Sequence, residues 1–143
     1  MMKWIEQHKQ LGPLILRVFF GAAFLVAGLD KVLSFEMMSG MFKSLFGNSL
    51  GTPMLVLAIV LELAGGAMLL LNWHANCAAL VLSGLIAVAF VMTFKLGIAP
   101  NVVGTLREMM VMNTGGGNTA VNLAYLAGLL SLAFSGCETC RKR

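Results

Sequence analysis

The chain has 143 residues, of which 59% are hydrophobic and 11% are charged, and its formal net charge is +4. Soluble domains carry about 25% charged residues, and a small soluble protein has a large surface to cover with polar groups. This composition therefore excludes an ordinary soluble domain and indicates that the lipid bilayer is the solvent. No basic run interleaved with aromatic residues is present, so no nucleic-acid partner is expected.

Four apolar stretches are each close to the roughly 20 residues that a helix needs to cross a bilayer. They cover about residues 11–29, 53–73, 77–94 and 119–136. The connection between the second and third is so short that these two helices must form an antiparallel hairpin. The sequence therefore predicts one domain over residues 1–143, an all-α membrane protein with a bundle of four transmembrane helices.

Basic residues near the ends of the spans predict the orientation, because cytoplasmic flanks carry more Lys and Arg. The terminal side has Lys3, Lys9 and the basic run 141–143, whereas the long connections carry Lys31, Lys43, Lys95 and Arg107. The dense run at the C-terminus favours a multi-pass protein of the cell membrane with both termini in the cytoplasm. Trp4 and Trp73 then both fall at the inner interface, where Trp is enriched.

The two long connections contain apolar residues at helical spacing. The first series is Phe35, Met38, Phe42, Leu45 and Phe46, and the second is Val102, Val103, Leu106, Met109 and Met110. Polar and charged residues lie between them, so both connections are expected to be amphipathic segments that lie on the outer interface or cap the bundle.

A weak internal repeat supports this layout. A shift of 63 residues places Gly21 on Gly84, residues 63–65 on 126–128, and Leu69 on Leu132. Each half is then a span, a long connection and a second span, which suggests a parallel duplication.

Two charged residues, Arg17 and Glu62, lie well inside the spans. A charge at the bilayer centre costs about 2.5–3.5 kcal/mol on insertion scales, so neither side chain should face lipid. Their predicted depths differ by only about 6 Å, which a long Arg side chain can bridge. The sequence therefore predicts that Arg17 and Glu62 pair, either as a structural ion pair that fixes helix register or as a polar site for a substrate or proton.

Helical spacing places both charges on stripes that include small residues. The first span carries Arg17, Gly21, Phe24, Gly28 and Lys31, and the second carries Ala58, Glu62, Gly65 and Leu69. Small residues let two transmembrane helices approach closely, so these stripes are expected to meet in one seam.

Further polar residues are expected at the outer ends of the spans. Lys31 and Lys95 lie at similar depth, Asp30 is adjacent, and Asn122 and Tyr125 share one face of the fourth span. Together they can form a cation-lined mouth that binds a substrate. The alternative is that both Lys side chains simply extend to the interface.

The C-terminal Cys137 and Cys140 form a CxxC motif. The pair is the candidate for catalysis, as a redox dithiol whose pKa the neighbouring Arg141 and Arg143 can lower. A zinc site would need two more ligands, and no second CxxC is present, so no metal site is predicted. The alternative is a pair of inert or lipidated thiols.

Several of these residues resemble the DoxX family of small four-helix membrane proteins. The similarity lies in LRVFFGAAFLVAGLDK (16–31), LELAGG (61–66) and NLAYL (122–126), and extends over about residues 11–136. The resemblance implies a four-helix membrane domain with charges typical of the family at Arg17, Lys31 and Glu62. Some relatives are subunits of a thiosulfate:quinone oxidoreductase, and others are linked to thiol redox homeostasis. The terminal CxxC is not part of the general family pattern.

The leading hypothesis is a membrane subunit of a redox system that docks a quinone or a small thiol compound near Arg17 and Glu62. It implies a quinone as the cofactor, and a partner redox subunit or a second copy of the chain. Two alternatives are a non-catalytic scaffold or chaperone for partner proteins and a small transporter, which would require an oligomer. The sequence shows no pair of haem-ligating His within the spans and no dinucleotide-binding motif.

Overall fold

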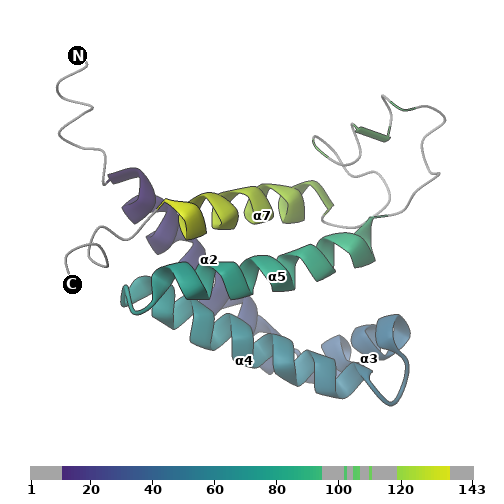
Figure 1. Cartoon of the computed structure of the whole chain (residues 1–143). Coiled ribbons are helices and arrows are strands. Elements are labelled where there is room, and N and C mark those ends of the chain that lie inside the picture. The colour runs from purple at the N-terminus through teal and green to yellow at the C-terminus, as the bar shows by residue number, and fades with distance from the viewer. Residues whose placement is uncertain (1–10, 95–101, 103–104, 107–109, 111–118, 136–143) are drawn as a thin grey trace, which may run out of the picture.

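A computed structural model of the chain describes residues 11–94, 102, 105–106, 110 and 119–135 (Figure 1). The helices are α2 (Leu11–Leu33), α3 (Phe35–Phe46), α4 (Gly51–Leu70), α5 (Ala75–Thr93) and α7 (Thr119–Phe134). The described residues contain no β-strand. Four of these helices lie side by side, and α3 lies at one end of α4 (Figure 1).

The predicted four-helix membrane bundle is confirmed. Helices α2, α4 and α5 are each long and apolar enough to cross a bilayer, and α7 is a shorter apolar helix. The boundaries differ from the predicted ones mainly in the first two spans. Helix α2 continues to Leu33, beyond the predicted end at residue 29, and α4 ends at Leu70, before the predicted end at residue 73.

The bundle consists of two helix pairs. Helix α2 packs most extensively against α4, and α5 against α7, while α4–α5 and α2–α7 contacts join the pairs. Helices α2 and α5 run in one direction and α4 and α7 in the other (Figure 1). This arrangement is the one that the 63-residue repeat predicts, with a helix, a connection and an antiparallel helix in each half.

Apolar side chains both fill the bundle and cover its outside. Phe24, Leu69, Leu82 and Leu129 are buried, whereas residues such as Val26 (66% exposed) are on the outer surface. A helix that is apolar on all sides is typical of a membrane span, because lipid replaces water around it. The buried side chains therefore mark the contacts between helices, and the exposed apolar side chains mark the lipid-facing surface.

Glycines allow α2 and α4 to pack closely. A Cβ atom on Gly66 would lie 2.9 Å from the Gly21 carbonyl oxygen and 3.0 Å from the Leu25 amide nitrogen. No larger residue fits there without moving backbone. Glu62 of the second predicted stripe does face α2, but Gly65 of that stripe packs against Leu82 of α5, so the two predicted stripes meet only in part.

Helix α3 confirms the first predicted amphipathic segment. Its Ser39 is buried, and the Ser39 hydroxyl lies 3.4 Å from the Thr52 hydroxyl of α4. Gly51 packs directly against the backbone of Lys43, which fixes the end of α3 on the start of α4. The second predicted segment, residues 102–110, falls mostly outside the described residues.

The connection between α4 and α5 is a tight turn at the opposite end of the bundle, called here the hairpin end. The Trp73 amide donates to the Met68 carbonyl and the Asn72 amide to the Leu69 carbonyl, with Asn72 at a φ of 56°. This pattern is a Schellman motif, which usually has Gly in the left-handed position but also accepts Asn. The end that carries α3 is called the α3 end.

Candidate functional site

Lys31 and Glu62 form an ion pair between α2 and α4, near the α3 end of the bundle. The Lys31 Nζ donates to both carboxylate oxygens of Glu62, at 2.8 and 2.9 Å, and lies 3.4 Å from the Ala27 carbonyl oxygen. The Glu62 side chain is 7% exposed and that of Lys31 is 19% exposed. The carboxylate is thus enclosed by the bundle, and the ammonium group is its bound cation.

Local helix geometry explains why Lys31 reaches Glu62. Side chains on a helix point toward its N-terminus, so Lys31 extends back along α2 by about one turn. On the same face, a Cβ atom added to Gly28 would lie 2.8 Å from the Leu63 side chain and 3.4 Å from the Glu62 Cβ. The absence of a side chain at Gly28 therefore lets α4 approach α2 closely beside Glu62.

The prediction that Arg17 pairs with Glu62 is wrong. The contact between Gly21 and Gly66 sets the antiparallel register and places Glu62 on the α3 side of Gly21, whereas Arg17 is one turn away on the hairpin side. Arg17 and Lys31 are about 21 Å apart along the helix axis, so Arg17 and Lys31 cannot serve the same carboxylate. The predicted pairing compared the depth of each residue within its own span. These depths carry no information on how α2 and α4 are shifted along each other.

Arg17 is half-buried, and its Nε atom is buried without a hydrogen-bond partner in the described part of the chain. It therefore remains a polar group inside the bundle, separate from the Lys31–Glu62 pair. The signal that could have identified Lys31 was its place on the same stripe as Gly28, two residues before the end of α2.

Asn122 belongs to a polar link between α5 and α7. Its Nδ2 donates to the Thr93 hydroxyl at 3.3 Å, and the Thr119 hydroxyl donates to the Thr93 carbonyl oxygen at 3.3 Å. The Thr93 hydroxyl in turn donates to the Ala89 carbonyl at 2.9 Å. Asn122 is thus close to the α3 end, as expected, but its bonds serve the second helix pair.

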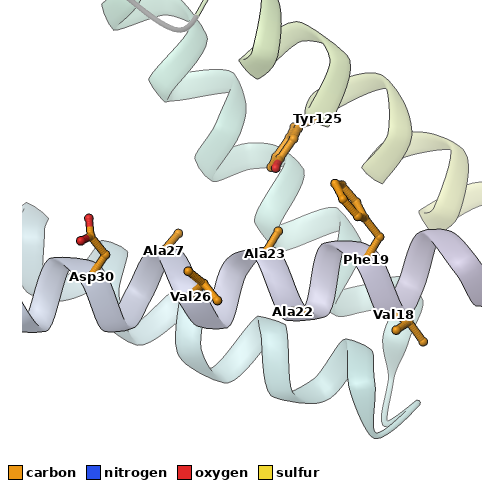
Figure 2. Close-up of a pocket in the computed structure, with 8 residues that line it drawn as sticks. All are labelled: Val18, Phe19, Ala22, Ala23, Val26, Ala27, Asp30 and Tyr125. Carbon is orange, nitrogen blue, oxygen red and sulfur yellow. The ribbon is translucent and has the colours of Figure 1, made fainter.

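Tyr125 packs in an aromatic cluster between α2 and α7. Its ring centroid lies 5.3 Å from that of Phe20 and 6.2 Å from those of Phe19 and Phe24, with edge-to-face orientations. Such pairs stabilise helix contacts beyond their area of burial. The same Tyr125 ring borders an open groove of about 620 Å³ along α2 (Figure 2), which the sequence did not predict.

The groove and the ion pair use different residues of α2. The groove is lined by Val18, Phe19, Ala22, Ala23, Val26, Ala27, Asp30 and Tyr125. Asp30 and Tyr125 therefore share one site, whereas Lys31 and Glu62 belong to another. Lys95, Cys137 and Cys140 lie outside the described residues. Among the residues that are described, no group of three or more His, Cys, Asp or Glu could hold a metal ion.

The long apolar helices define a multi-pass α-helical membrane protein. Within that class, a family model described as DoxX matches residues 12–95. The match covers more than half of the chain and includes Arg17, Lys31 and Glu62, so the chain belongs to the DoxX family and the resemblance seen in the sequence is confirmed. No curated protein and no solved structure matches the chain.

Proposed function

We propose that the chain is the membrane subunit of a redox system and that it docks a quinone or a small thiol compound at Lys31 and Glu62. The observation that supports this proposal is a charged pair enclosed between the membrane-spanning helices α2 and α4. A buried ion pair is often no more stabilising than well-packed apolar residues of the same volume. Ionisable groups within membrane spans therefore mark functional sites by default.

The pair has the chemistry that a quinone requires. Reduction of a quinone to a quinol takes up two electrons and two protons. The Lys31 ammonium can donate a hydrogen bond to a quinone carbonyl, and the Glu62 carboxylate can exchange a proton beside it. The electrons come from a partner redox subunit or a thiol compound. Arg17, Lys95, Asn122 and Tyr125 remain further candidates for contacts with the substrate.

Cys137 and Cys140 are proposed as a reversible dithiol that exchanges with cytosolic thiols or with a partner subunit. CxxC spacing and basic neighbours favour a thiolate, and the reducing cytosol disfavours a permanent disulfide. Acid trapping followed by alkylation should show an oxidised fraction that rises under oxidant stress and falls on recovery. A pair that stays reduced under stress would leave the redox role to the Lys31–Glu62 site.

Both termini are proposed to be cytoplasmic, which places the hairpin end of the bundle on the cytoplasmic side. Cys77 is exposed near the start of α5, at this same end. A membrane-impermeant thiol reagent applied to intact cells should therefore leave Cys77, Cys137 and Cys140 unlabelled. Rapid labelling from outside would reverse the proposed orientation.

The main test is purification from native membranes in mild detergent, followed by mass spectrometry of co-purified proteins and quinones. We expect a bound quinone or thiol compound that is retained by the Glu36→Gln control, because Glu36 is exposed on α3. The double variant Lys31→Met/Glu62→Leu removes both charges together, so no partner remains unpaired, and it should lose the bound molecule. Partner proteins without any such molecule would instead support a scaffold.

A further inference from the structure

The groove on α2 has apolar walls and one charged end. Ala22, Ala23, Val26 and Ala27 line it along α2, and Tyr125 borders it from α7. Figure 2 shows the Tyr125 ring pointing from α7 toward α2, and Asp30 at the far end of this stretch from Val18 and Phe19. A ligand in the groove would therefore meet hydrocarbon along its length and a carboxylate at the α3 end.

The dimensions of the groove favour a single extended chain. Val18 and Asp30 are separated by about 18 Å along the helix axis. The groove is open along this length and has a volume of about 620 Å³. An extended acyl chain can therefore lie along the α2 side chains beside Tyr125.

The polar groups of the groove select the head of such a molecule. Asp30 is exposed, and its carboxylate has no ion pair within the described residues, because the neighbouring Lys31 is bound to Glu62. The Tyr125 hydroxyl likewise has no hydrogen bond to another described residue. An unpaired carboxylate at the end of an apolar groove attracts a cationic head group and repels an anionic one.

From this charge pattern, we propose that the groove binds one acyl chain of an amine-headed phospholipid such as phosphatidylethanolamine. The acyl chain lies along Val18, Ala22 and Ala23, and the ammonium group is bound by the Asp30 carboxylate. The Tyr125 hydroxyl donates a hydrogen bond to an ester carbonyl of the lipid. Phosphatidylglycerol, which has the same chains but an anionic head group, binds less well at this position.

Native mass spectrometry of the whole protein in detergent, titrated with phosphatidylethanolamine and phosphatidylglycerol of identical chains, tests this site. Wild type should retain phosphatidylethanolamine in preference. Asp30→Asn, a surface change that preserves the fold, should reduce this preference by about threefold. Glu36→Gln removes a carboxylate outside the groove and should leave the preference unchanged. Equal retention of the two lipids, or a preference that survives Asp30→Asn, would overturn the proposal.

A second variant tests the groove itself. Ala23→Phe places a large side chain in the groove and should reduce retention of both lipids without changing the oligomeric state. A change from dimer to monomer with lipid retention unaltered would show that the groove binds another copy of the chain. If added ubiquinone displaces the phospholipid equally from wild type and from Asp30→Asn, the ligand of the groove is a quinone. Either result would contradict the lipid site.

Discussion

The α2–α4 half and the α5–α7 half have the same layout, but different polar links hold them together. A 63-residue shift places Lys31 on Phe94 and Glu62 on Tyr125. The first half has the ion pair at this level, whereas the second has the neutral hydrogen bonds of Thr93 at the same end of the bundle. A helix pair of this layout can therefore be held together without a buried charge. The stability of the pair does not explain why the first half has one.

The halves also differ in the surroundings of their equivalent glycines. Gly21 and Gly66 bring the backbones of α2 and α4 together, but the repeat equivalent of Gly21 is Gly84, where an added Cβ would meet no atom within 4 Å. The first half thus has a glycine contact between helix backbones that is absent at the equivalent position of the second half. It combines a fixed register with a buried ion pair, which is the combination that a binding site requires.

Breaking the ion pair should have the largest effect. Lys31→Ala or Glu62→Ala alone leaves a charge without its partner inside the bundle and should lower the free energy of unfolding in detergent by about 3–5 kcal/mol. The double variant Lys31→Ala/Glu62→Ala should lose much less than the sum. Strictly additive losses in this double-mutant cycle would show that the two residues do not stabilise each other.

The glycine contact can be tested against its repeat equivalent. Gly66→Ala forces a Cβ against the Gly21 carbonyl and the Leu25 amide, both backbone groups, and should cost about 1–3 kcal/mol of unfolding free energy. Gly84→Ala has open space and should be neutral or stabilise the helix by up to about 1 kcal/mol. Equal effects at the two positions, measured by thermal unfolding in the same detergent, would remove this difference between the halves.

The neutral link of the second half should contribute less. Asn122→Leu removes the hydrogen bond to Thr93 and should cost about 0.5–1.5 kcal/mol, because a single neutral hydrogen bond has this net value. Denaturation of this variant beside Glu62→Ala compares the two links directly. If Asn122→Leu lowers the free energy of unfolding as much as Glu62→Ala does, the charged link is no more stabilising than the neutral one.

The smallest expected effect is the coupling between Arg17 and Glu62. Because Glu62 is bound to Lys31 and the two glycines set the register, Arg17→Met and Glu62→Gln should be additive within about 0.5 kcal/mol. The cycle uses the same unfolding measurement as the Lys31 cycle. A coupling above about 1 kcal/mol would restore the pairing that the sequence suggested.

The sequence predicted the helices and their inward faces well, because both depend on local pattern. Gly21, Phe24, Glu62 and Gly65 are all buried, as their helical spacing required. These stripes follow from the 3.6-residue period of one helix at a time. The four-helix class followed in the same way, from the length and apolar character of each stretch.

The partner of Glu62 could not be predicted, because it depends on how two helices slide past each other. That register is decided by the contact of Gly66 with the Gly21 carbonyl and the Leu25 amide, a tertiary contact. The groove was missed for a related reason. Its existence depends on the distance between α2 and α7 beside Tyr125, which no single-helix pattern contains.

The α4–α5 turn places backbone strain at the junction between the two halves. Asn72 and His74 both have left-handed backbone conformations, with φ values of 56° and 50°, and neither is Gly. A left-handed conformation is costly for a residue other than Gly, so the packing of α4 against α5 offsets this strain. The strained turn is at the hairpin end, the opposite end of the bundle from Asp30, Lys31 and Glu62.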